Sequence, residues 1–135
     1  MFNLSRYERR KAHPVRIADV VVGGDNPIAV QSMTNTSTAD VASSVEQTCR
    51  IADAGAPIVR LTAQGRKEGE ALAPIVGELR RRGYATAIVA AIPCTPERAM
   101  RAAESVDKVR IIPGNFRTPN GELERLVAIC RRRGV

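Results

Sequence analysis

Short apolar runs alternate with helix-length amphipathic stretches along this chain, and this alternation restricts its fold more than any other feature. The runs lie at 27–33 (PIAVQSM), 57–61 (PIVRL), 86–92 (TAIVAAI) and 108–112 (KVRII). The last three are rich in Val and Ile, as strands buried on both faces of a parallel sheet are. The alternation predicts a parallel α/β fold. A (β/α)₈ TIM barrel needs eight such units and about 250 residues, so these 135 residues are predicted to form its N-terminal half, with the first four βα units.

The first two amphipathic stretches carry clear helix stop signals. The first helix is predicted over 40–54 and is followed by Gly55. The second is predicted over 67–82 and stops at Gly83. Glycine adopts the left-handed backbone conformation that commonly ends a helix, so both boundaries have a physical cause.

The last two stretches are placed by their start signals. Thr95 is a suitable N-cap, and Pro96 follows it at the first helical position, where a missing N–H costs nothing. The fourth helix is predicted to run from an Asn120 cap to Gly134. Val135 would then open a fifth strand.

The N-terminal part of the chain differs from the rest. Residues 1–14 (MFNLSRYERRKAHP) are mostly polar and are predicted to form an arm. The apolar triplets 15–17 and 20–22 surround a short turn and predict a small β-hairpin that plugs the bottom of the barrel. Residues 15–135 are therefore interpreted as one partial barrel domain.

Membrane and secreted classes are disfavoured. No apolar run approaches the ~20 residues of a membrane-spanning helix, and no apolar segment follows the basic residues of the arm. We expect a cytoplasmic bacterial protein without a membrane partner. Cys49, Cys94 and Cys130 are odd in number and widely spaced, which predicts neither a disulfide framework nor a metal site. Cys49 and Cys130 are interpreted as packing residues, and Cys94 as a packing residue or a reactive thiol.

The charge indicates an anionic partner. The net charge is +7 and the isoelectric point is about 10.2. Two Tyr, two Phe and no Trp provide few platforms for stacking bases, so nucleic acid is the less favoured partner. Most of the basic residues, Arg80 to Arg82 among them, are expected on solvated helix faces.

Arg60 and Arg110 are different because each lies inside an apolar strand. An unpaired guanidinium there is costly, so each side chain needs an anionic partner. In a barrel the C-terminal strand ends form the active site, where two arginines could hold a diphosphate. A buried ion pair with Asp53, Asp107 or another acid is the structural alternative.

The turn at 113–115 (PGN) directly follows the strand of Arg110. Its glycine and Asn115 are predicted to present backbone N–H groups and an amide at the same rim. No nucleophile–base pair accompanies these residues, and the only histidine, His13, lies in the polar arm. No catalytic residue and no metal ligand is therefore assigned.

Several sequence blocks resemble one enzyme family. They are Gly23-Gly24-Asp25, the block PIAVQSMTNT at 27–36, Ile58-Val59-Arg60, and Val109-Arg110-Ile111 followed by PGNF at 113–116. These blocks strongly resemble 4-hydroxy-3-methylbut-2-enyl diphosphate synthase of the non-mevalonate pathway of isoprenoid (terpenoid) biosynthesis. The opening SRYERRK and the TAQG at 62–65 are similar to its larger bacterial and plastid form, which has an extra middle domain.

The resemblance implies an iron–sulfur oxidoreductase. Its TIM barrel would hold 2-C-methyl-D-erythritol 2,4-cyclodiphosphate, and flavodoxin or ferredoxin would supply electrons for reductive ring opening. A separate C-terminal domain, absent from this chain, would carry a [4Fe-4S] cluster and its ligands. By the same resemblance Arg60 and Arg110 hold phosphate oxygens, and Asn115 belongs to the same rim. Gln31 and Gly114 complete the predicted substrate-binding set.

Three positions depart from the family pattern. Ala91 and Pro93 stand where the family has a carboxylate and an imidazole, and Ile112 stands where it has an asparagine. Loss of these polar groups predicts weaker substrate binding. Without the other half of the barrel and the cluster domain that the resemblance implies, we expect no turnover by this chain alone. Two alternatives remain open: a non-catalytic phosphate-binding or self-assembling half-barrel, which would form a homodimer, and a general polyanion or nucleic-acid binder.

Overall fold

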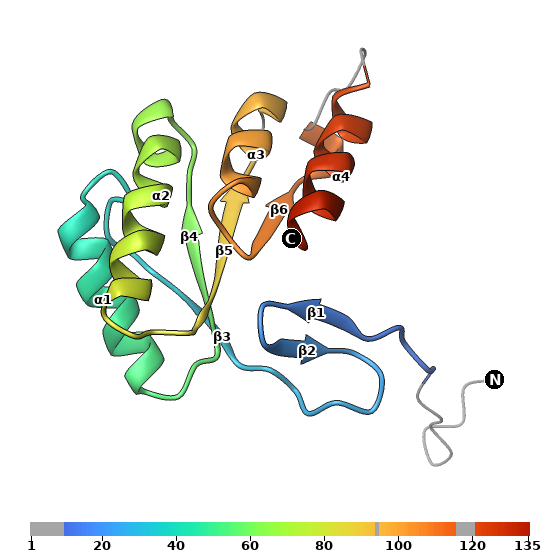
Figure 1. Ribbon diagram of the computed structural model, residues 1–135, viewed down its shortest axis with the longest axis horizontal. Helices are drawn as coiled ribbons and strands as arrows, with labels where there is room; N and C mark the ends of the chain where they lie inside the picture. The colour runs from blue at the N-terminus through green and yellow to red at the C-terminus, as the bar shows by residue number, and fades with distance from the viewer. Residues whose placement is uncertain (1–9, 94, 116–120) are drawn as a thin grey trace.

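The computed structural model describes residues 10–93, 95–115 and 121–135, and from residue 31 onward strands and helices alternate (Figure 1). A four-stranded parallel sheet has the order β3-β4-β5-β6. Its strands are β3 (Gln31–Met33), β4 (Ile58–Thr62), β5 (Ala87–Ile92) and β6 (Lys108–Ile111). The helices are α1 (Val41–Asp53), α2 (Arg66–Arg81), α3 (Pro96–Ala103) and α4 (Glu122–Arg133). The predicted parallel α/β fold is confirmed.

The helix boundaries follow from local chemistry. Asp40 caps α1, because its Oδ1 accepts a hydrogen bond from the Ser43 N–H at 3.0 Å. Gly55 and Gly83 follow α1 and α2 with φ angles of 90° and 85°, the left-handed conformation predicted for them. Thr95 is the N-cap residue of α3, as predicted, although its side chain makes no capping hydrogen bond.

Three predicted boundaries need correction. Residues 27–30 lie outside β3 because β4 begins at Ile58, which is level with Gln31, so they have no strand to pair with. The predicted cap Asn120 lies outside the described residues, and Gly121 is the N-cap residue of α4. Val135 does not open a strand, since its N–H instead donates to the Cys130 carbonyl at 2.9 Å.

The two faces of the sheet have opposite character. One face is covered by the helices, and its side chains are almost completely buried: Val59, Leu61, Ile88, Ala90 and Ile92. Side chains alternate between faces along a strand, and residues that are level on neighbouring parallel strands share a face. The second face, here called the open face, therefore carries Gln31, Met33, Arg60, Thr62, Lys108 and Arg110.

A hairpin covers one end of the open face. Strands β1 (Val15–Ile17) and β2 (Val20–Val22) pair antiparallel, and Ile17 is buried against Ile58, Ala87 and Val89. Ile58 and Ala87 are the first residues of β4 and β5, and Figure 1 shows the hairpin beside the ends of the sheet where these strands begin. The predicted hairpin is confirmed, and it lies where a plug of the barrel bottom was expected.

Among the described residues, no helix is both long enough and apolar enough to span a lipid bilayer.

Candidate anion-binding site

The two arginines that the sequence singled out lie on the open face, on either side of β5. Arg60 of β4 is level with Val89, and Arg110 of β6 is level with Ala91. Neighbouring strands are ~4.8 Å apart and two residues advance ~6.6 Å along a strand, which puts the two Cα atoms about 12 Å apart. Two arginine side chains can span this gap to reach one diphosphate.

The Arg60 guanidinium has N–H donors that make no strong hydrogen bond to another described residue. Its side chain is half-buried, and its Nη2 donates to the Met33 Sδ at 3.0 Å. A thioether sulfur is a weak acceptor. The Arg60 Nε is buried and has no hydrogen-bond partner among the described residues. Burying a guanidinium donor without a partner is unfavourable, so the position favours an incoming anion.

Arg110 is not buried as the sequence predicted. It is exposed, because β6 has a strand on only one side within the described part of the chain. Its side chain makes no hydrogen bond or ion pair with another described residue. Arg110 is therefore an exposed cation at the rim and not a buried charge.

The predicted ion-pair alternative with Asp53 or Asp107 is wrong. The Asp107 Oδ2 accepts hydrogen bonds from Arg80 Nη2 and from the Ile88 N–H, both at 2.7 Å. Asp53 accepts from the Tyr84 hydroxyl at 3.0 Å. Both carboxylates thus have partners elsewhere, and neither neutralises Arg60 or Arg110.

The other predicted binding residues are arranged less favourably. Gln31 is exposed on the open face, but it lies one row of side chains below Arg60, at the start of its strand. Gly114 and Asn115 form an exposed 3₁₀ turn (Pro113–Asn115) directly after β6. The Asn115 N–H donates to the Ile112 carbonyl at 3.0 Å, so it is not the free donor that was predicted. The Asn115 side chain is exposed at this rim.

The departures from the family pattern lie beside the arginines. Ala91 is buried and level with Arg110 and Thr62, so its methyl group forms part of the floor between the two arginines. Pro93 and Ile112 are half-buried at the ends of β5 and β6. Cys94, considered as a reactive thiol, lies outside the described residues.

A hydroxyl-rich pocket at the same end of the sheet was missed by the sequence analysis. It has a volume of about 340 Å³ and is lined by Thr34, Asn35, Thr36, Ser37, Thr38, Thr62, Gln64 and Glu68. Thr34 is only 5% exposed, and its Oγ1 has no hydrogen-bond partner among the described residues. The run TNTST directly after the first strand was the signal available in the sequence.

Gln47 of α1 holds the loop that lines this pocket. Its Oε1 accepts from the backbone N–H groups of Asn35 at 3.0 Å and Thr36 at 3.2 Å. Its Nε2 donates to the Asn35 Oδ1 at 2.6 Å. One amide side chain therefore fixes the loop on the helix layer and leaves the hydroxyl groups to line the pocket.

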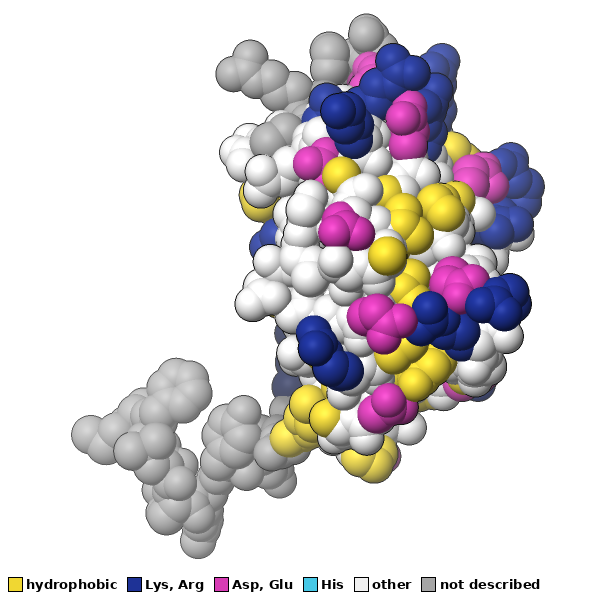
Figure 2. Space-filling view, turned by 90° about the vertical axis from the view of Figure 1, so that its left-hand side faces the viewer, with side chains coloured by type: hydrophobic (Ala, Val, Ile, Leu, Met, Phe, Trp, Pro, Cys, Tyr) yellow, Lys and Arg dark blue, Asp and Glu magenta, His cyan; other side chains and the backbone are white. Residues whose placement is uncertain are grey.

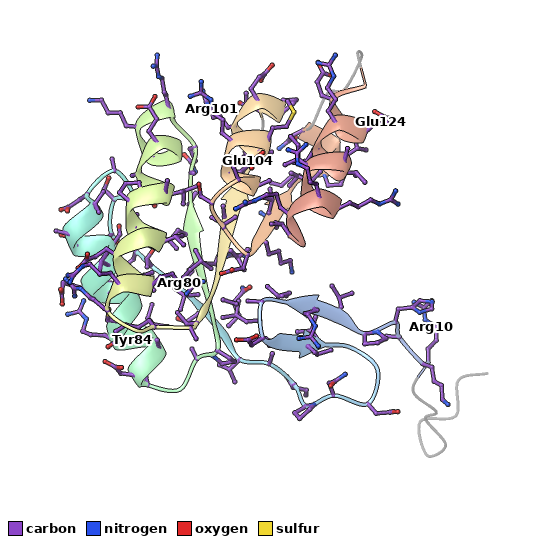
Figure 3. All side chains as sticks on the ribbon, viewed as in Figure 1. Arg10, Arg80, Tyr84, Arg101, Glu104 and Glu124 are labelled. Atoms are coloured by element: carbon purple, nitrogen blue, oxygen red, sulfur yellow. The ribbon has the colours of Figure 1, made fainter. Side chains whose placement is uncertain are left out.

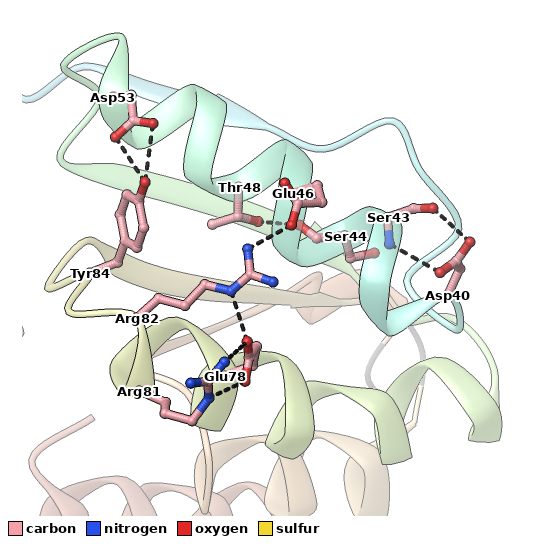
Figure 4. A network of polar contacts seen from close by, with 10 residues as sticks. All are labelled: Asp40, Ser43, Ser44, Glu46, Thr48, Asp53, Glu78, Arg81, Arg82 and Tyr84. Atoms are coloured by element: carbon pink, nitrogen blue, oxygen red, sulfur yellow. Dashed lines mark hydrogen bonds and ion pairs between the residues drawn. The ribbon is translucent and has the colours of Figure 1, made fainter.

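Away from the site, Arg80 and Tyr84 lie at the end of α2 (Figure 3), and the arginines that follow Arg80 are paired with carboxylates (Figure 4). Arg82 bridges Glu46 of α1 and Glu78, with N–O distances of 2.6 and 2.7 Å, and Arg81 also binds Glu78. These hydrogen bonds lower the pKa of Glu78 to about 2. The hydrogen bond to Asp53 raises the pKa of Tyr84 to about 12.

The helix surface gives little support to a general polyanion binder. Figure 2 shows positive and negative side chains intermixed on the side that α1 and α2 form, with hydrophobic side chains between them. Duplex binders instead gather Lys and Arg in a continuous patch or stripe. On this side of the molecule the +7 charge is therefore not concentrated into a nucleic-acid surface.

The described residues do not fit an iron–sulfur cluster. Cys49 is buried in the core on α1, and Cys130 is half-buried on α4. Burial raises the pKa of the Cys130 thiol, which opposes the thiolate that a cluster requires. No three His, Cys, Asp or Glu side chains among the described residues come together as metal ligands.

Comparison with known proteins bears on the fold of the chain. Residues 12–135 match the family described as the GcpE TIM-barrel domain. A chloroplastic 4-hydroxy-3-methylbut-2-en-1-yl diphosphate synthase (ferredoxin) of Oryza sativa subsp. japonica is 45% identical over 118 residues, which cover 87% of this chain and 16% of the relative. The flavodoxin-type synthase of Protochlamydia amoebophila is 46% identical over 120 residues, 89% of this chain and 18% of the relative. The flavodoxin-type synthase of Bacteroides thetaiotaomicron is 50% identical over 114 residues, 84% and 19% of the two chains. The chain thus spans about a fifth of the length of these relatives.

Proposed function

Because this chain belongs to the GcpE TIM-barrel family, whose full-length relatives are 4-hydroxy-3-methylbut-2-en-1-yl diphosphate synthases, we propose that it supplies the phosphate-holding half of such a barrel. The confirmed fold, a partial TIM-barrel domain, supports the proposal. Its substrate would be 2-C-methyl-D-erythritol 2,4-cyclodiphosphate, held for reductive ring opening in isoprenoid biosynthesis. Arg60, Arg110, Asn115, Gln31 and Gly114 remain the proposed binding residues.

The state of Arg60 is the observation that carries this proposal. Its Nε is buried without a hydrogen-bond partner among the described residues, and its Nη2 has only a thioether partner. A phosphate oxygen would satisfy these donors with charge-assisted hydrogen bonds. Arg110, exposed on the same face, would bind the second phosphate.

The contribution of these residues is binding and orientation. Two cations that hold the diphosphate would neutralise its charge and fix the ring relative to the electron source, and such positioning is a large part of catalysis. In the proposed full enzyme, a [4Fe-4S] cluster would supply the electrons, and flavodoxin or ferredoxin would reduce it. Since no described residues of this chain fit that cluster, we propose that the chain alone has no turnover.

Titration of the chain with the cyclodiphosphate tests the proposal. Isothermal calorimetry and thermal unfolding should show binding and a rise in melting temperature, because a ligand that binds only the native state stabilises it. Arg60→Ala and Arg110→Ala should each weaken binding on the order of tenfold or more. Arg50→Ala is the matched control, since Arg50 lies exposed in the last turn of α1, away from the open face. Equal affinity in all three variants, or turnover by the chain with reductant alone, would refute the proposal.

Self-assembly of the half-barrel is a second candidate with its own observation. Within the described residues, β3 and β6 each have one neighbouring strand, and α4 exposes Leu123 and Val127 beside a groove of about 390 Å³. Exposed strand edges favour pairing with another chain. A sedimentation experiment decides it, because a stable monomer at high concentration excludes a homodimer.

A further inference from the structure

The contact between Met33 and Arg60 has a chemical consequence beyond anion binding. Met33 lies on β3, level with Arg60 on the open face, and is 41% exposed. Its Sδ accepts the Arg60 Nη2 hydrogen bond at 3.0 Å. Met100 makes a useful contrast, because it is half-buried and packs against the helix-side core. Met33 is thus the methionine that a dissolved oxidant can reach beside the proposed anion site.

Oxidation would change what this sulfur offers to the guanidinium. A thioether is a weak acceptor, whereas a methionine sulfoxide is polar and presents an oxygen acceptor. Arg60 has a buried Nε without a partner among the described residues. A new oxygen bonded to Met33 Sδ would lie within reach of Arg60 and would compete with phosphate for the same donors.

We propose that Met33 is a reversible oxidation site whose sulfoxide captures Arg60 and weakens anion binding at the open face. The inference rests on the proposed function for its effect on binding, and on the Met33–Arg60 contact alone for the capture itself. Hydrogen peroxide is the oxidant. The Met33 sulfur attacks one peroxide oxygen, an S–O bond forms as the O–O bond breaks, and the other oxygen leaves as water. Sulfur loses two electrons and the peroxide gains them.

The Met33 sulfoxide would capture Arg60 and not Arg110. Arg110 lies on β6, with β5 between it and β4, so the sulfoxide would engage Arg60 and leave Arg110 free. The modified site would then keep one of its two arginines for phosphate. Methionine sulfoxide reductase would restore the thioether and release Arg60.

Peroxide treatment of the intact chain tests the inference at two independent levels. Peptide mass mapping over time compares oxidation of Met33 with that of Met100, and Met33 should react first. An NMR spectrum of the arginine Nε–H groups, assigned with Arg60→Lys, should then show the Arg60 signal shifted, and reductase treatment should return it. Met33→Leu is the matched control, in which peroxide should leave the Arg60 signal unchanged.

Pyrophosphate titration is the second level. Oxidised chain should bind pyrophosphate on the order of tenfold more weakly than untreated chain, the loss that follows from one hydrogen bond to a charged group. If untreated chain does not bind pyrophosphate, the proposed function fails while the Arg60 signal still decides the capture. Oxidation of Met33 no faster than Met100, or a sulfoxide that leaves the Arg60 signal in place, overturns the inference.

Discussion

Replacement of Asp107 by alanine should destabilise the fold more than any other single change of a surface charge. The Asp107 Oδ2 accepts from the N–H of the fully buried Ile88 and from Arg80 Nη2, and both distances are 2.7 Å. Its removal leaves a buried N–H unsatisfied and breaks a partly exposed ion pair, for a total loss of about 2.5 kcal/mol. Arg80 keeps its hydrogen bonds to two backbone carbonyls, so its own burial adds little.

Urea unfolding followed by circular dichroism measures this loss in the free energy of unfolding directly. In a thermal melt the same loss of about 2.5 kcal/mol should lower the melting temperature by about 8 °C in a chain of this size. Asp107→Asn keeps an acceptor for the Ile88 N–H and should lose only about 1 kcal/mol. Glu70→Ala, which breaks the exposed pair with Arg66, should change nothing measurable. If Asp107→Ala unfolds at the same urea concentration as the parent chain, the role assigned to this carboxylate is refuted.

Three further outcomes are expected. Glu78→Gln should make stability less dependent on pH in acid. Contacts with Arg81 and Arg82 lower the pKa of Glu78 from 4.5 to about 2, so its contribution to the free energy of unfolding is complete above pH 4.5 and is lost as the pH falls toward 2. Urea midpoints measured against pH would show this. Tyr84→Phe should make stability less dependent on pH in alkali. The hydrogen bond to Asp53 raises the Tyr84 pKa from 10.0 to about 12, so the stability that this bond provides is lost as the pH rises through that range. Alkaline unfolding that is the same in parent and variant would contradict this. Gln47→Ala should accelerate hydrogen exchange of the amides at 35 and 36, and equal exchange rates would show that the loop needs no such support.

The element order and most boundaries could be predicted from the sequence because they depend on local chemistry. Gly55 and Gly83 have the left-handed φ angles that were expected of them, and Asp40 caps the helix it precedes. Apolar periodicity separated strands from helices correctly. The first strand was predicted too long because PIAV before Gln31 is apolar, while its pairing depends on where β4 begins 27 residues later.

The site was predicted less completely because exposure and pairing are tertiary properties. The apolar run KVRII predicts that Arg110 is buried, but its exposure depends on whether a neighbouring strand covers β6. The partner of Asp107 is Arg80, a residue that the sequence placed on a solvated helix face. The pocket around Thr34 forms only when the loops after β3 and β4 meet, so hydroxyl composition was its only trace in the sequence.

The unequal faces of the sheet bear on the order in which such a barrel forms during synthesis. Each strand of the parallel sheet pairs with the strand next to it in sequence, and the buried residues of the helix-side core lie between Val45 and Leu126. Contacts between near neighbours in sequence form quickly, whereas synthesis adds only about 5–20 residues per second. The helix layer can therefore consolidate on a ribosome-bound chain while later barrel units of a longer polypeptide are still being made. Arg60, Lys108 and Arg110 tolerate water, so the open face carries charged side chains that suit a nascent, half-closed barrel.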